Sequence, residues 1–140
     1  MRLGWSVLCR DYGRLVDGAV VLHKVFADTR LTLSLPQHGP LVVPLDPPFA
    51  LVSYWYRESD AESRLYPAIL RVSAPGDNRI IGEMRFDIDL RQSNSRFASF
   101  QFRRFNYVSD GLYEFQIEVP EFADWDVTSH NSVYIVGNVS

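Results

Sequence analysis

The chain has one cysteine, Cys9, and one lysine, Lys24, among 140 residues. A single cysteine excludes an internal disulfide framework and a cysteine-rich zinc site, and it favours a reducing compartment. The sequence also lacks the run of about 20 apolar residues that a membrane-spanning helix needs. Its first ten residues have too short an apolar run for a secretory signal peptide. We therefore expect a soluble, cytoplasmic protein.

Positive charge is also scarce, because 14 basic residues stand against 17 acidic ones and leave a net charge of −3. No global positive field is present to attract nucleic acid or an anionic membrane surface, so a nucleic-acid partner would need a local basic patch. The share of hydrophobic residues, 46%, and of charged residues, 22%, is ordinary for a globular protein. The length predicts a single domain spanning residues 1–140.

No extended stretch repeats apolar residues at the 3.6-residue period of a helix. Alternating apolar and polar residues dominate instead, and clusters of turn residues recur at the short spacing typical of sandwiches and barrels. The sequence therefore predicts an all-β fold, a two-layer antiparallel β-sandwich of immunoglobulin-like or C2-like type. We expect about seven to nine strands, as such sandwiches have.

Residues 3–9 begin this pattern, and their alternation predicts one buried strand face made of Leu3, Trp5, Val7 and Cys9. The polar residues 11–14 and the pair Asp17-Gly18 predict a turn. Three prolines among residues 44–48 predict an extended connection, because proline has no N–H to donate to a ladder.

The clearest structural signal lies in residues 97–119, where two aromatic segments flank the Asp110-Gly111 turn. In the first segment, Phe100 and Phe102 share one phase of the alternation, and Phe105 lies in the other. The register must therefore slip at Arg103 and Arg104, and a β-bulge there would absorb the extra residue.

Residues 111–115, with the sequence Gly-Leu-Tyr-Glu-Phe, resemble the corner that enters the penultimate strand of immunoglobulin-like sandwiches. Phe115 stands where antibody domains have a cysteine. Residues 8–12, with the later segments 17–18 and 26–28, resemble the opening of a family of small bacterial proteins known only as a domain of unknown function. That resemblance implies a bacterial source and a sandwich fold, and it supplies no catalytic residues.

Catalytic and metal-binding patterns are weak in this sequence. Cys9 lies in a buried strand position, where a thiol is unreactive, and no nucleophile elbow is present. His23, His38 and His130 are far apart and form no metal-binding pair. The loop acids are scattered and lack a calcium-loop signature; they are Asp60, Glu62, Asp77, Asp124 and Asp126. We therefore expect no catalytic residue, no metal site and no cofactor.

Five residues are the candidates for binding. Arg103 and Arg104, thrown outward by a bulge, are placed to contact a carboxylate or phosphate on a partner. Trp55, flanked by Arg57, forms an exposed platform if the other face of its strand is the core, and it is buried if both faces are covered. Trp125 lies in a loop between two acids.

These observations favour a non-enzymatic interaction or structural module that contacts a protein partner or another copy of itself through an edge strand. The first alternative is a small-molecule or carbohydrate binder that uses Trp55, Tyr56, Arg57 or the Trp125 loop. The second is an enzyme whose pocket is formed by residues distant in sequence.

Overall fold

The computed structural model describes residues 1–17, 19–26, 30–37, 42–121 and 129–139. These residues form nine strands and a single 3-10 turn, η1 (Asp60–Glu62), and none of their helices is long and apolar enough to cross a membrane. The strands are β1 (Arg2–Arg14), β2 (Val20–Val25), β3 (Arg30–Leu35), β4 (Val42–Tyr56), β5 (Leu65–Ser73), β6 (Ile80–Asp89), β7 (Ser95–Asn106), β8 (Gly111–Glu118) and β9 (Ser129–Val139).

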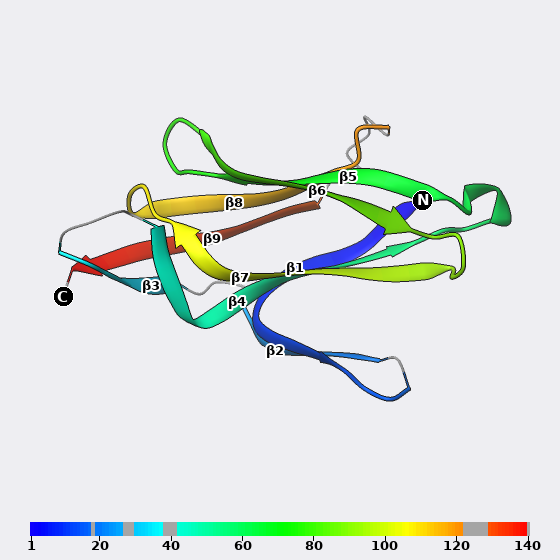
Figure 1. Cartoon of the computed structure of the whole chain (residues 1–140), viewed down its shortest axis with the longest axis horizontal. Helices are drawn as coiled ribbons and strands as arrows, with labels where there is room; N and C mark the ends of the chain where they lie inside the picture. Colours follow the sequence, from blue (N-terminus) through cyan, green and yellow to red (C-terminus); the bar gives the residue numbers. More distant parts are fainter. Residues whose placement is uncertain (18, 27–29, 38–41, 122–128, 140) are drawn as a thin grey trace.

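Two sheets pack face to face, and this confirms the predicted β-sandwich (Figure 1). The order of the four-stranded sheet is β2-β1-β4-β7, and that of the five-stranded sheet is β3-β9-β8-β5-β6. Among the described strands, β3 and β9 pair in parallel, whereas every other pairing is antiparallel as predicted. The parallel pairing joins strands far apart in sequence, so the long chain between them is free to bring both in the same direction.

The order of the strands from β4 to β9 is that of an immunoglobulin-like sandwich, with β4 and β7 in one sheet and β8 between β5 and β9 in the other. The corner before β8 also has the expected geometry. The Tyr113 hydroxyl accepts hydrogen bonds from the N–H groups of Val108 (2.9 Å) and Ser109 (3.2 Å), and it donates to the Ser109 carbonyl (2.8 Å). A side chain thus ties the start of β8 to the chain that precedes it.

The core lies between the two sheets, and aromatic rings from both sheets fill it. Phe115 of β8 contacts Phe49 of β4 edge to face, with ring centroids 5.8 Å apart. This contact joins the two strands that carry the disulfide of antibody domains. The largest fully buried side chains are Trp55, Tyr66, Tyr113, Phe49 and Phe115.

The predicted buried face of β1 is wrong in part. Leu8 lies in the core between the sheets, whereas Cys9 packs with Ala50 on the outer face of the four-stranded sheet. A register shift between Leu3 and Trp5 changes the phase of the alternation, so Trp5 also faces outward and is 36% exposed. Tyr12 and Leu22 of the β1–β2 hairpin pack against Cys9, which explains how a residue on an outer face is fully buried.

The predicted turn begins later than expected: residues 11–14 are strand, because β1 continues to Arg14 and pairs with β2, and Val16 and Asp17 form the turn. The region of residues 59–64 agrees with the sequence: it is a loop that contains only the single turn η1. A segment so short cannot sustain a longer helix.

Candidate binding site at the open edge between β6 and β7

Arg103 and Arg104 lie near the end of β7, the outermost strand of the four-stranded sheet. The register of β7 with β4 breaks at this point: Phe102 pairs with Phe49 and Arg104 with Pro44, so residues 45–48 of β4 stand opposite Arg103 alone. The predicted register slip is confirmed at this point, but the predicted bulge in β7 is wrong, because the extra residues belong to β4. Its prolines cannot donate to the ladder, which explains why the break falls there.

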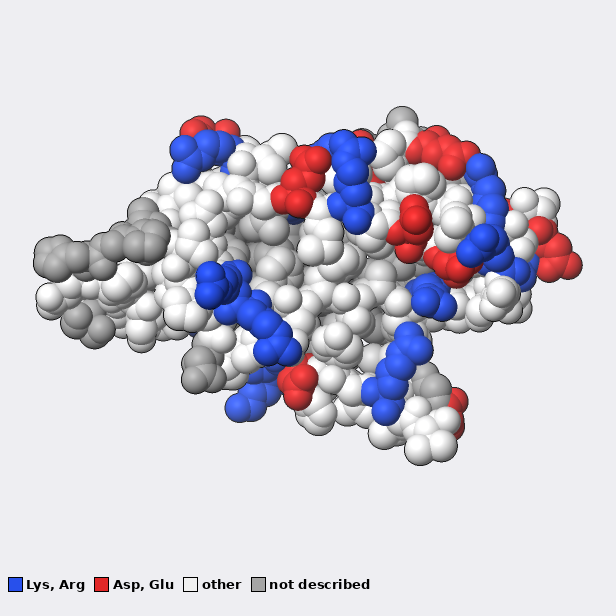
Figure 2. Space-filling model, viewed as in Figure 1, with Lys and Arg blue, Asp and Glu red and all other residues white. Residues whose placement is uncertain are grey.

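The break leaves both arginines on the outside of the sandwich. Phe102 is partly buried against the core and Phe105 is buried, whereas Arg103 and Arg104 between them are both exposed. Both side chains are exposed where the pairing of β7 with the irregular part of β4 breaks. Figure 2 shows basic side chains gathered over this end of β7.

The edge strand of the other sheet, β6, faces β7. Phe86 of β6 and Phe100 of β7 meet edge to face, with ring centroids 4.7 Å apart. Farther along the strands, a pocket of about 260 Å³ opens between them. Its lining includes the apolar residues Val72, Ile81, Phe102 and Phe105 and the polar residues Arg104 and Asn106. We name this pocket, with Arg103 beside it, the open edge.

Gly82 of β6 also lines the pocket, and it keeps the pocket wide. A Cβ atom added at Gly82 would lie 3.7 Å from Val72 Cβ, an ordinary van der Waals contact. A larger side chain is therefore tolerated by the backbone at this position and would occupy the space of the pocket.

The two arginines of the open edge have no ion pair or hydrogen bond with any residue that the structure describes. Most other arginines are neutralised by carboxylates: ion pairs hold Arg2, Arg57, Arg64, Arg71, Arg85 and Arg91. Two guanidinium groups beside an apolar pocket are thus available for an external carboxylate or phosphate, which guanidinium binds with paired hydrogen bonds.

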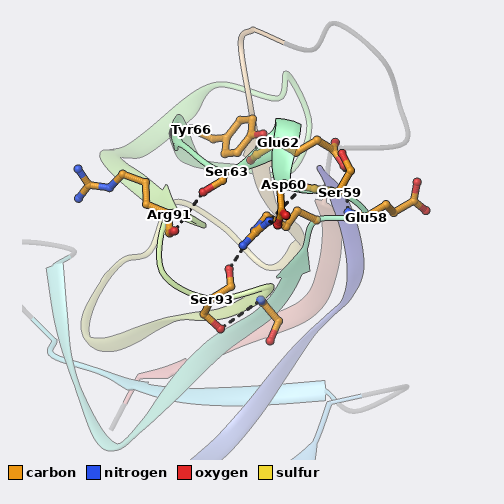
Figure 3. A network of polar contacts seen from close by, with 10 residues as sticks. Glu58, Ser59, Asp60, Glu62, Ser63, Tyr66, Arg91 and Ser93 are labelled. Atoms are coloured by element: carbon orange, nitrogen blue, oxygen red, sulfur yellow. Dashed lines mark hydrogen bonds and ion pairs between the residues drawn. The ribbon is translucent and has the colours of Figure 1, made fainter.

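Arg57, also predicted as a binding residue, has a structural role instead. Its side chain is only 10% exposed and forms an ion pair of 2.8 Å with Asp60. It also donates to the backbone carbonyls of Ser59 (3.1 Å) and Ser93 (3.3 Å). These contacts fasten η1 to the loop before β7, and Figure 3 shows the partners Ser59, Asp60 and Ser93 close to one another.

Trp55 is fully buried in the core, so the buried alternative for this residue is confirmed and an exposed platform is ruled out. The indole N–H donates to the Ser53 hydroxyl (2.8 Å), which in turn donates to the Ala98 carbonyl (3.2 Å). A buried indole normally has such a partner. Trp55 is part of the core and has no exposed surface that a ligand could contact.

Outward-facing rings of β1, β4 and β7 form a surface that was not predicted from the sequence. Trp5 stacks on Tyr54 with centroids 6.0 Å apart, and Tyr54 contacts Tyr56 (6.2 Å) and Phe97 (5.0 Å). We name these four residues the aromatic strip. The signal was present in the sequence, because the strand at residues 50–58 has large rings on both faces.

The remaining candidates add no chemistry among the described residues. Burial raises the pKa of the Cys9 thiol above its ordinary value, with a smaller contribution from the charge of Asp11, so the thiol stays protonated. Where the chain is described, no three metal-ligating side chains gather at one place. Trp125, His38, Asp124 and Asp126 lie outside the described residues.

Comparison with known proteins gave no relative: the sequence matches no protein-family model and no curated protein. The resemblance of residues 8–28 to a small bacterial family therefore stays a prediction.

Proposed function

We propose that this protein is a non-enzymatic interaction module that binds a segment of a protein partner at the open edge. The observation that carries this proposal is the pair Arg103 and Arg104, uncompensated by any described residue, beside an apolar pocket between two edge strands. The matching segment presents an aliphatic side chain to the pocket and a carboxylate to the guanidinium groups. We place the protein in the bacterial cytoplasm, where its single thiol, Cys9, stays reduced.

The surroundings of the pocket favour a polypeptide ligand. Both β6 and β7 pair on one side only with described strands, so their other backbone edges are available to an added strand. Exposed apolar side chains occur in the lining and close to it along β6: Val42, which lines the pocket, is 48% exposed, and Ile80 and Met84, near the lining residues Ile81 and Gly82, are 51% and 53% exposed. Exposed apolar surface next to charged groups is typical of a docking site.

The polar groups of the pocket favour binding over catalysis. Where the lining is described, its polar side chains are the guanidinium of Arg104 and the amide of Asn106. A guanidinium and an amide are hydrogen-bonding groups and are not among the side chains that usually act as general acids or bases. Both groups form hydrogen bonds well, as recognition of a carboxylate requires.

A peptide-display selection against the purified protein tests this function. We expect enriched sequences in which Leu, Ile or Val adjoins Asp or Glu. Replacing both arginines by glutamate (Arg103→Glu, Arg104→Glu) removes charge-assisted hydrogen bonds and should weaken peptide binding roughly tenfold or more. Gly82→Leu fills the pocket and should weaken binding without changing the charge.

The matched control for the charge change is Arg96→Glu, since Arg96 is exposed on β7 at the opposite end from the open edge. This variant should bind the selected peptides as the unchanged protein does. Peptides that bind the variants of Arg104 and Gly82 as tightly as the unchanged protein would refute the proposed site.

The aromatic strip supports a second candidate function, the binding of a carbohydrate or other small molecule. Trp5 and Tyr54 lie nearly parallel, with an interplanar angle of 21°, and Trp5 is 36% exposed. Aromatic rings with an apolar face and a polar edge suit the stacking of sugar rings. A glycan array should give hits that the variant Trp5→Ala loses, and an array without hits removes this candidate.

A further inference from the structure

The hairpin of β1 and β2 projects from the sandwich and presents an apolar tip (Figure 1). At this tip Leu15 is 54% exposed and Val16 is 109% exposed. Hairpin turns usually expose polar residues or glycine, so two neighbouring aliphatic side chains held in solvent point to burial against another surface.

The turn that holds these side chains is fixed by hydrogen bonds. The Leu15 N–H donates to the Ala19 carbonyl (2.8 Å), and the Ala19 N–H donates to Asp17 Oδ1 (3.0 Å). The tip is therefore shaped before it meets a partner, which lowers the entropic cost of docking. Asp17 forms no ion pair with any described residue, so its carboxylate is available to an external cation.

The tip and the open edge are complementary. Leu15 and Val16 followed by Asp17 give two aliphatic side chains beside a carboxylate. The open edge has an apolar pocket of about 260 Å³ with Arg104 in its lining. Aliphatic side chains in this pocket would bring the Asp17 carboxylate near guanidinium groups that lack any other described partner.

We propose that the hairpin tip of one copy of this protein docks into the open edge of a second copy. This inference depends on the proposed function, since it names the occupant of the same site. The contact must join two copies, because β2 and β7 are opposite edges of one sheet and β1 and β4 stand between them. Every copy has both the hairpin tip and the open edge. The concentration of the tip, which is the ligand here, therefore equals the concentration of the protein.

The geometry of the contact sets the kind of assembly. The tip and the open edge are different surfaces, so a single contact leaves one of each unoccupied. Further copies can add through these unoccupied surfaces until two copies exchange hairpins reciprocally or a ring closes, as heterologous contacts allow. The average mass in solution should therefore rise with protein concentration.

Sedimentation velocity over a wide range of concentration tests the inference. The unchanged chain should associate, and Val16→Asp or Arg104→Glu should each weaken association tenfold or more. Leu112→Ser is the matched control, because Leu112 is 52% exposed on β8 and does not line the pocket. Thermal unfolding of all variants shows that each is folded.

Disulfide trapping identifies the contact itself. A chain carrying Val16→Cys is mixed with a chain carrying Asn106→Cys under a mild oxidant. A mixed disulfide should form faster than with Leu112→Cys as the second chain, and the buried Cys9 does not compete.

A chain that stays monomeric at every concentration, or that associates as well with Val16→Asp as without it, overturns the inference. If the chain is monomeric but selected peptides still bind the open edge, the inference is wrong and the proposed function stands. If neither a second copy nor any peptide binds there, both are wrong.

Discussion

The two long sides of the sandwich are closed in different ways. On one side the first halves of β1 and β9 meet, and the Ser6 hydroxyl accepts hydrogen bonds from the Ser129 hydroxyl and the Asn131 amide, each 2.6 Å long. On the other side β6 and β7 touch through Phe86 and Phe100 and then part at the open edge. On the first side the polar groups form hydrogen bonds within the chain, whereas on the second side Arg103 and Arg104 have no ion pair with any described residue.

The same difference separates individual arginines. The side chain of Arg57 is almost buried and donates hydrogen bonds to Asp60 and to two backbone carbonyls. Arg104 is exposed and has no such partner among the described residues. Residue type alone therefore does not assign a function, and the position of the carboxylates decides which guanidinium serves the fold and which can serve recognition.

The variant with the largest expected effect on stability tests whether Trp55 belongs to the core between the two sheets. Trp55→Ala should lower the free energy of unfolding by about 3–5 kcal/mol, because it creates a cavity in a fully buried site. Urea denaturation measures this loss. Tyr54→Ala, on the outer face of the same strand, is the control and should cost clearly less. Equal losses would show that the outer rings are as buried as the core.

Removal of the Ser6 hydroxyl tests the closed side. Ser6→Ala leaves the Ser129 hydroxyl, which is fully buried, without its acceptor, and the Asn131 amide keeps only the longer hydrogen bond to Ser129 Oγ (3.3 Å). A buried donor without a partner costs about 1–3 kcal/mol, so we expect a loss of that size in urea denaturation. Ser99→Ala on the exposed face of β7 serves as the control. A loss no larger than that of the control would mean that this side is not held by its polar groups.

A pH-dependent effect is expected at the corner that follows β7. Burial, together with a hydrogen bond to Asp110, raises the pKa of Tyr107 from 10.0 to about 12. The unfolded chain thus releases this proton at lower pH than the folded chain does. The contribution to stability is fully present below pH 10 and is lost as the pH rises toward about 12. Unfolding titrations should therefore show that Tyr107→Phe loses less stability than the unchanged protein across this interval, and parallel curves would contradict the assignment.

Several features of the fold were predictable because they depend on neighbouring residues. The phases of Phe102 and Phe105 predicted the outward pair between them, and residues 111–115 predicted the corner at Tyr113. The orientation of Trp55 was not predictable, because alternation distinguishes two strand faces without saying which one meets the other sheet.

The open edge itself depends on residues far apart along the chain. Ile81 and Phe102 line one pocket, and only the relative course of β6 and β7 brings them together. Arg57 likewise finds a partner in Ser93, 36 residues later. Local patterns carry no information on how two edge strands diverge, so the arginines were found from the sequence and the pocket beside them was not.

The variant with the smallest expected effect on the free energy of unfolding tests whether the arginines of the open edge contribute to the fold. The double variant Arg103→Ala and Arg104→Ala removes two exposed side chains without described partners and should change the free energy of unfolding by no more than about 0.5 kcal/mol. Arg57→Ala, measured beside it, removes an almost buried set of hydrogen bonds and should cost more. If the double variant were the less stable of the two, the open edge would be a structural element, and its arginines would be unavailable to a partner.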